Sequence, residues 1–179
     1  MHLSRRELSR MESAMTEQST FMASARRTID IEHRAVGELS QRIGPSFAMA
    51  CERLLNCTGR IIVTGMGKSG HIASKIAATL SSTGSPAFFV HPAEASHGDL
   101  GMITDKDVVL ALSYSGTTSE IMAILPMLKR QGIPLISMTG APDSPVAQAS
   151  DIHIDASVRE EAWATGESGA PVMEISGMP

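Results

Sequence analysis

The stretch IIVTGMGKSGHIASKIAATLSS, residues 61–82, joins a short apolar run to a glycine-rich turn and then to an amphipathic segment. The run IIVTG is continuous rather than alternating, which is typical of a strand buried on both faces of a sheet. Similar apolar runs follow as AFFVH, VVLALS, PLISMTG and a last segment around 151–154, and helices are predicted over 69–82 and 118–131. This alternation, with four or five strands, predicts an α/β fold in which helices cover both faces of a parallel sheet.

The sequence on either side of this region has a different character. Residues 1–26 are polar with isolated methionines, so we expect disorder or a frayed helix there. From Thr28 apolar residues recur at helical spacings, and two consecutive helices are expected before Gly59. Residues 163–179 contain glycines and prolines without periodicity, which predicts an irregular tail. The predicted domain therefore spans 27–162.

Composition narrows the class of protein. The chain has 179 residues, of which 42% are hydrophobic, and no apolar run reaches the length of about 18 residues that a membrane span needs. A net charge of −4 and few aromatic residues argue against a nucleic-acid partner. Cys51 and Cys57 form neither a disulfide framework nor a zinc-type pair, and the basic start is not followed by an apolar signal segment. A cytoplasmic protein without a membrane or nucleic-acid partner is expected.

The loop after the first predicted strand, Gly65-Met66-Gly67-Lys68-Ser69-Gly70, matches the GxGxxG spacing of dinucleotide-binding turns. That motif also needs an acidic residue about 20 positions later, where this chain has Val90 and His91. A Walker-type phosphate loop is excluded, because Ile62 stands where it needs a glycine. Two interpretations remain: an anion site with Lys68 and Ser69 at a helix start, or a tight turn with Lys68 in solvent.

The loop after the third predicted strand, Ser113 to Glu120, carries five serine and threonine hydroxyls around one glycine. Hydroxyl groups together with the N–H groups of a helix start suit a phosphate monoester, whose oxygens accept several hydrogen bonds. The alternative is a capping box, in which Thr117 caps the helix and Glu120 bonds back to it.

The loop after the second predicted strand places His91, Glu94, His97 and Asp99 within nine residues. Histidine transfers protons near neutral pH, so two of them beside a phosphate site suggest catalysis. A metal site is the weaker alternative, because no single helix brings these side chains to a familiar ligand spacing.

Together, the blocks GMGKSGHIASKIAATLSSTGSPAFFVHPAEASHGDLGMI and SYSGTTSEI resemble the sugar isomerase (SIS) domain, and within it the D-arabinose 5-phosphate isomerase branch. The resemblance covers about residues 28–162. It implies a flavodoxin-like three-layer sandwich with a five-stranded parallel sheet. It also implies interconversion of D-ribulose 5-phosphate and D-arabinose 5-phosphate for 3-deoxy-D-manno-octulosonate and lipopolysaccharide synthesis. No cofactor is implied, and the family assembles as homo-oligomers, by resemblance tetramers.

The same resemblance assigns roles to individual residues. By similarity, Lys68, His97, Glu120 and Glu161 match catalytic positions, and His91 matches one that contacts substrate and can take an inhibitory zinc ion. The remaining similar positions bind or line the substrate, and they are Ser69, Gly84, Ser85, Ser113, Ser115 and Thr118.

The resemblance ends after Ala162. There the family normally continues through a proline- and threonine-rich stretch into a long helix, a further histidine and often two CBS modules, whereas this chain reads WATGESGAPVMEISGMP. We therefore expect a C-terminally truncated family member, with a non-catalytic phosphosugar-binding module as the alternative. The segment HPAEASHGDLG speaks against a phosphoheptose isomerase.

The implied reaction moves a carbonyl between C1 and C2 of a pentose phosphate. It requires a group that removes a proton beside the carbonyl and a positive or hydrogen-bonding group where the enediolate develops. The sequence leaves open whether Glu120 or Glu161 is the acid/base, and it offers His97 for proton transfer and Lys68 for the developing charge.

Overall fold

A computed structural model describes residues 5–95, 99–165 and 171–174. The chain divides into two compact units. One is Gln41–Ser157, and the other combines the terminal segments Met1–Ser40 and Val158–Pro179. The first unit contains the sheet that the sequence predicts.

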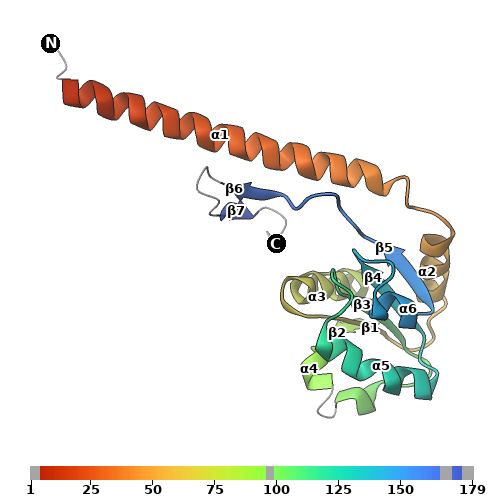
Figure 1. Ribbon diagram of the computed structural model, residues 1–179. Helices are drawn as coiled ribbons and strands as arrows, with labels where there is room; N and C mark the ends of the chain where they lie inside the picture. The colour runs from red at the N-terminus through yellow and green to blue at the C-terminus, as the bar shows by residue number, and fades with distance from the viewer. Residues whose placement is uncertain (1–4, 96–98, 166–170, 175–179) are drawn as a thin grey trace. The chain divides into compact units, whose positions relative to one another are not determined.

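The central sheet has five parallel strands in the order β2-β1-β3-β4-β5 (Figure 1). This is the flavodoxin-like order, so the predicted fold class is confirmed. The strands match the predicted apolar runs to within two residues at each end. They are β1 (Ile61–Gly65), β2 (Ala87–Phe89), β3 (Val108–Leu112), β4 (Leu135–Thr139) and β5 (Ile152–Asp155).

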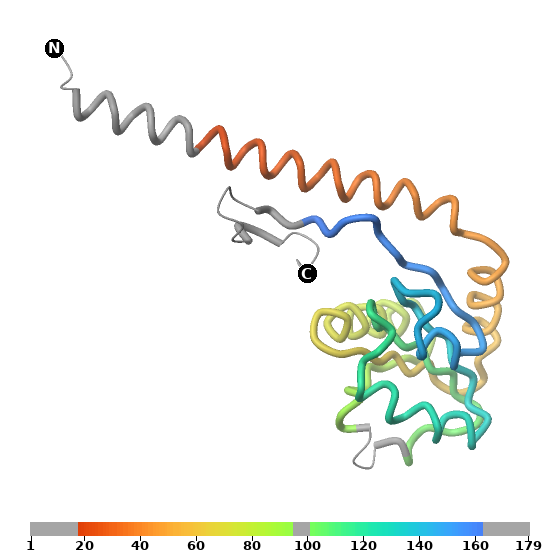
Figure 2. The backbone as a smooth tube through the Cα atoms, in the orientation of Figure 1, coloured from red at the N-terminus to blue at the C-terminus, as the bar shows by residue number. Residues whose placement is uncertain are grey.

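Each face of the sheet carries a separate apolar cluster, because successive side chains of a strand point to opposite faces. Val63 and Leu110 pack on the side of α2 (Pro45–Leu55) and α3 (Gly67–Ser82). Ile62 and Val109 pack on the side of α5 (Ser119–Gln131) and α6 (Pro145–Ala149). Figure 2 follows the same alternation of strand and helix along the chain. The unit is therefore a three-layer sandwich, as the resemblance implied.

The amino edge of the sheet is held by an ion pair between the buried carboxylate of Asp107 and the more exposed guanidinium of Arg60. The Asp107 side chain is 1% exposed and accepts hydrogen bonds from the Arg60 backbone N–H (2.7 Å), the Arg60 guanidinium (3.1 Å) and the Thr104 N–H (2.8 Å). Burial alone would raise the pKa of Asp107, but the bonds from Arg60 and Thr104 outweigh it and the pKa is lowered. Asp107 therefore ties the start of β3 to the start of β1.

Three short elements were not predicted from the sequence: α6, α4 (Pro92–Ala95) and the 3-10 helix η1 (Asp99–Met102). Each has five residues or fewer, which is too short for helical periodicity to show. α6 begins with Pro145 after the N-cap Ser144, whose hydroxyl accepts a hydrogen bond from the Ala147 N–H at 3.4 Å.

The terminal unit differs from the sequence-based expectations. Helix α1 runs from Arg5 to Leu39, so it continues through most of the segment for which disorder or a frayed helix was predicted. Within the region predicted to be an irregular tail, Trp163–Thr165 and Pro171–Glu174 pair as antiparallel strands β6 and β7. Strands this short leave little periodicity in a sequence.

Ion pairs lie between the two segments of the terminal unit. Arg34 contacts Glu160 at 3.0 Å, and Arg159 contacts Glu38 at 3.1 Å. Among the described helices, none combines the length and the apolar character needed to cross a bilayer.

Candidate functional site

The candidate site lies at the carboxyl ends of β1 and β3, which are neighbours in the sheet. From β1 the chain crosses to β2 on one side, whereas β3 leads to β4 on the other, so the strand order reverses at this point. Open α/β sheets bind ligands at such a reversal. Helices α3 and α5 start there, and the N–H groups of a first helical turn have no acceptor within the helix. Two helix N-termini therefore favour an anion at this edge.

The turn between β1 and α3 is compact because of its glycines. Gly67 has φ +54°, a conformation that favours glycine. A Cβ on Gly65 would lie 2.8 Å from the Ser69 carbonyl oxygen, so the strand and the helix start approach each other closely. Lys68 is exposed and Ser69 is half-buried in the first turn of α3. The geometry fits an anion site, and it leaves open which role Lys68 plays.

The loop after β3, residues 113–118 and here called the hydroxyl loop, folds its hydroxyl groups together. The buried Ser113 Oγ accepts a hydrogen bond from the Gly116 N–H at 3.1 Å and lies 2.8 Å from Thr118 Oγ1. The exposed Ser115 Oγ accepts a hydrogen bond from Thr117 Oγ1 at 3.1 Å. Gly116 takes φ +64°, which allows this tight turn. The loop thus gathers several donors and acceptors next to the start of α5.

The capping-box interpretation of this loop is wrong. The N-cap of α5 is Thr118 rather than Thr117, and its side chain makes no capping hydrogen bond. Glu120 instead accepts a hydrogen bond from Ser119 Oγ at 2.9 Å. Its own backbone N–H, the Ser119 hydroxyl and an electrostatic interaction with His91 together lower the pKa of Glu120. Glu120 is therefore a carboxylate at neutral pH in the ligand-free chain.

His91 follows β2 and lies near the start of α5. The end of β2 is fixed to β1, because Thr64 Oγ1 donates to the Val90 carbonyl at 2.7 Å and the Val90 N–H donates to the Val63 carbonyl at 3.0 Å. The His91 ring meets Phe89 edge-on, with centroids 6.3 Å apart. Its Nδ1 atom is buried and has no hydrogen-bond partner in the part of the chain that the structure describes. The imidazole is therefore positioned by packing, and its role in substrate binding stays a prediction.

Two further predicted catalytic residues, His97 and Glu161, are not among the described residues of the sheet unit. His97 lies outside the described residues. Glu161 belongs to the terminal unit and is exposed. Both roles stay predictions. Within residues 5–95, 99–165 and 171–174, no group of three side chains is arranged to hold a metal ion.

Gly84 and Ser85 are not brought to the hydroxyl loop within this chain. They form the turn between α3 and β2, where Gly84 has φ +98° and the Ser85 N–H donates to the Leu80 carbonyl at 3.0 Å. That turn precedes β2, at the amino edge of the sheet, whereas the loops lie at the carboxyl edge. Their role in lining the site stays a prediction.

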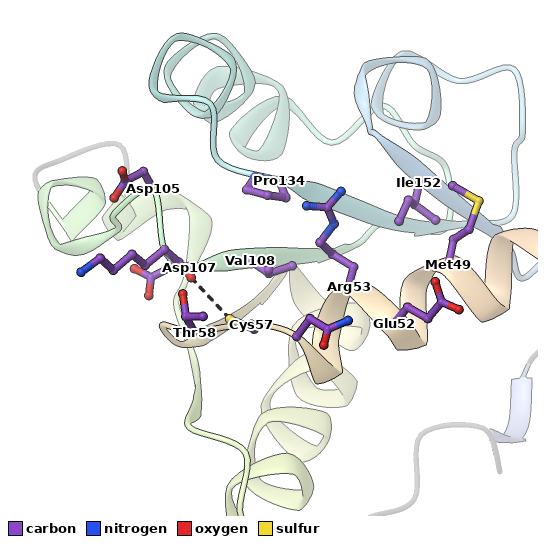
Figure 3. A pocket seen from close by; sticks show the side chains of 12 residues that line it. Met49, Glu52, Arg53, Cys57, Thr58, Asp105, Asp107, Val108, Pro134 and Ile152 are labelled. Atoms are coloured by element: carbon purple, nitrogen blue, oxygen red, sulfur yellow. Dashed lines mark hydrogen bonds between the residues drawn. The ribbon is translucent and has the colours of Figure 1, made fainter.

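A groove of about 450 Å³ lies at the amino edge of the sheet (Figure 3). It is lined by α2 and by the turn that precedes β3. Arg53 and Glu52 reach into it from α2, and Val108 and Ile152 form part of its apolar wall. The Cys57 thiol lies 3.5 Å from the Lys106 carbonyl oxygen, to which it donates. The groove contains none of the predicted site residues, so it is separate from the candidate site.

Sequence reasoning missed the support that the hydroxyl loop receives from Ser144 and from Val146 at the start of α6. The Val146 N–H donates to the Gly116 carbonyl at 3.1 Å, and Ser144 occupies the space that a Cβ on Gly116 would need. The residues GAPDSP have the composition of a turn, which is a signal for a loop but not for its contact with another loop.

Known proteins share this architecture. The family model for the SIS domain matches residues 54–176. The arabinose 5-phosphate isomerase KdsD of Pseudomonas aeruginosa is 62% identical over 148 residues, which are 83% of this chain and 45% of that protein. KdsD of Salmonella typhi is 51% identical, covering 82% and 44%. The chain thus spans less than half the length of these curated relatives.

A solved structure points to the same family. The structure of Escherichia coli CFT073 c3406 in complex with arabinose 5-phosphate superposes with a TM-score of 0.78 at 40% identity, covering 88% of this chain and 82% of that one. The SIS family model matches most of the sheet unit, and that unit has the five-stranded parallel sheet that the resemblance implied. The chain therefore belongs to the SIS domain family.

Proposed function

We propose that this protein is an aldose-ketose isomerase that interconverts D-ribulose 5-phosphate and D-arabinose 5-phosphate through an enediolate. The observation that carries the proposal is the meeting of two hydroxyl- and glycine-rich helix starts at the reversal point of the sheet. The names of relatives up to 62% identical support this substrate, as does the sugar-phosphate complex of c3406. The product would serve 3-deoxy-D-manno-octulosonate and lipopolysaccharide synthesis in the cytoplasm.

The phosphate group binds at the starts of α3 and α5 in this proposal. A phosphate monoester carries nearly two negative charges at neutral pH and three acceptor oxygens. Hydrogen-bond donors for these oxygens come from the N–H groups of the first turns of α3 and α5. The hydroxyls of Ser69, Ser115 and Thr118 supply further donors. Ser113 is buried and bonded to Thr118, so it orients that hydroxyl as well as offering its own.

The reaction is a proton transfer between neighbouring carbons. A carboxylate removes a proton from C1 of ribulose 5-phosphate, the electrons move to the C2 carbonyl oxygen as an enediolate, and a proton returns to C2 to give the aldose. Glu120 or Glu161 performs this transfer, His97 moves protons between the two oxygens, and Lys68 stabilises the developing negative charge. Atoms and electrons balance without a redox cofactor.

Glu120 becomes a stronger base once substrate is bound. In the ligand-free chain its pKa is lowered by its own N–H, Ser119 and His91. A bound phosphate dianion at the same helix start would raise that pKa by charge repulsion and by excluding water. The substrate itself thus moves the carboxylate toward the proton affinity that the reaction needs.

His91 contacts the sugar in this proposal, because its buried Nδ1 lacks a hydrogen-bond partner among the described residues. A zinc ion bound at the same nitrogen would compete with substrate. The described residues form no group of three metal-ligating side chains around it, so such an ion would take further ligands from elsewhere.

A homo-oligomer, by resemblance a tetramer, is also proposed, with α1 as an interface. Met22, Ile29 and Val36 recur at intervals of seven residues on α1 and are 55%, 58% and 66% exposed. Seven-residue spacing of apolar side chains forms one stripe along a helix and suits packing against a second helix. A second copy of this chain supplies such a helix.

The purified chain incubated with D-ribulose 5-phosphate in deuterated water tests the proposed function. We expect formation of the aldose with incorporation of deuterium at C2, and an unchanged or higher rate with chelator. Calorimetric binding of arabinose 5-phosphate without deuterium incorporation would instead identify a phosphosugar-binding module. Absence of both binding and exchange would refute the phosphosugar proposal altogether.

A further inference from the structure

We propose that Gly140 and Tyr114 form a positioning pair that holds the hydroxyl loop in its anion-binding shape. The inference rests on the proposed phosphate-binding role of that loop. Gly140 directly follows β4, and Tyr114 lies in the loop between Ser113 and Ser115. Neither residue is a phosphate ligand in the proposed mechanism, so both act through the loop.

Backbone hydrogen bonds connect the two segments at three successive points. The Ser113 N–H donates to the Met138 carbonyl at 3.1 Å, and the Gly140 N–H donates to the Tyr114 carbonyl at 2.8 Å. Further along, the Val146 N–H donates to the Gly116 carbonyl at 3.1 Å. The chain after β4 therefore runs beside the hydroxyl loop and fixes its path.

Gly140 leaves room for the tyrosine ring. A Cβ at position 140 would lie 2.4 Å from Tyr114 Cε2 and 2.8 Å from Cδ2 and Cζ. Gly140 is not among the glycines with positive φ, so alanine could adopt its backbone conformation. Space for the Tyr114 ring, rather than backbone freedom, is thus what this position requires.

Displacement of the ring would reach the phosphate-binding groups directly. Tyr114 shares its two peptide bonds with Ser113 and Ser115, and the buried Ser113 Oγ bonds to both Gly116 N–H and Thr118 Oγ1. Tyr114 is 47% exposed and belongs to neither apolar cluster, so moving its ring disturbs the loop more than the core. A methyl group at position 140 should therefore weaken anion binding and leave the fold intact.

Gly140→Ala tests this, with Gly140→Ala/Tyr114→Ala as the rescue and Gly37→Ala on α1 as the control, because a Cβ at Gly37 meets nothing within 4 Å. Binding of inorganic phosphate and of arabinose 5-phosphate is measured by calorimetry, KM and kcat by the isomerase assay, and folding by thermal melting. We expect Gly140→Ala to weaken phosphate binding about tenfold and to raise KM more than it lowers kcat. The double variant should bind phosphate as Tyr114→Ala alone does, because the added methyl group meets no ring when Tyr114 is absent.

The outcomes separate this inference from the proposed function. If the unmodified chain binds no phosphate, the proposed function fails first. If it binds phosphate and Gly140→Ala binds equally well, the positioning pair is refuted. Should Gly140→Ala fail to fold, the double variant decides: folding with the phosphate affinity of Tyr114→Ala supports the pair, and folding with an affinity below that of Tyr114→Ala overturns it.

Discussion

At the scale of single residues, the environment of Glu120 determines how the proposed base behaves. Its carboxylate is hydrogen-bonded to Ser119 and to its own N–H, and its pKa is lowered. The pH profile of kcat/KM reports the ionisations of the free enzyme. If Glu120 is the base, kcat/KM should therefore fall on the acid side at a pH below the ordinary glutamate pKa of 4.5. Persistence of this acid-side fall in Glu120→Gln would contradict Glu120 as the base.

Replacing each candidate carboxylate in turn distinguishes Glu120 from Glu161. Glu120→Gln keeps the hydrogen-bonding shape and removes the base, so we expect exchange of the substrate proton to fall by about 10²- to 10⁴-fold if Glu120 is that base. Calorimetric affinity for arabinose 5-phosphate and the melting temperature should change little. Glu161→Gln is the matched variant, and whichever substitution leaves exchange intact removes that residue from the role.

Asp107 offers a residue-scale test of stability. Asp107→Asn removes the charge that pairs with Arg60, and loss of hydrogen bonds to a buried charged group should lower the free energy of unfolding by about 2 kcal/mol at pH 7. Because the pKa of Asp107 is lowered on folding, this contribution is present above its ordinary value of 3.8 and is lost as the pH falls through the lower folded value. Denaturant unfolding of both proteins at pH 7 and pH 3 measures it, and an equal difference at the two pH values would contradict the assignment.

At the scale of elements, strands and their order of appearance were predictable, because continuous apolar runs such as IIVTG and VVLAL are buried on both faces. The start of α5 was not. The sequence pattern Thr117 to Glu120 fits a capping box, but the bond between Ser113 and Thr118 draws the loop into another turn. Here a contact between a strand end and a helix start overrides the capping preference of the local sequence. Such a contact cannot be recognised from the residues around the cap alone.

The packing of α3 on β1 gives a prediction for the glycines. In Gly65→Ala the new Cβ would lie 2.8 Å from the Ser69 carbonyl oxygen, so the helix must shift and the protein should lose about 1–3 kcal/mol of stability. Gly37→Ala is the control, since it adds a better helix former to open space and should stabilise α1 by up to about 1 kcal/mol. Circular dichroism during thermal melting measures both. An unchanged stability of Gly65→Ala would show that the turn can accommodate a Cβ without loss of packing.

At the scale of the whole molecule, the position of the candidate site could be predicted because strand topology places the first and third loops together at one edge. The place of Gly84 and Ser85 in the site could not be predicted from strand topology, since the turn that carries them lies at the amino edge. Local sequence spacing says which loop a residue occupies. It does not say whether a second copy of the chain brings that loop to the site.

The exposed stripe on α1 gives a whole-molecule prediction. Ile29→Glu places a charge in the middle of the apolar stripe and should shift the chain to a smaller assembly, because an unpaired charge buried in an interface is strongly unfavourable. Ala23→Glu, an exposed α1 position away from the stripe, is the control. Analytical ultracentrifugation at several concentrations measures the mass. An unchanged mass for Ile29→Glu would remove α1 from the interface.

The contact between Tyr114 and Gly140 has a practical consequence for spectroscopy. Tyr114 is the single tyrosine of the chain, and its ring lies beside the hydroxyl loop. Isotope labelling of tyrosine alone would therefore give one aromatic NMR signal set per polypeptide. Changes in this signal set during titration with a sugar phosphate would then report binding at the hydroxyl loop. Separate signals would show that the subunits of an oligomer bind it differently.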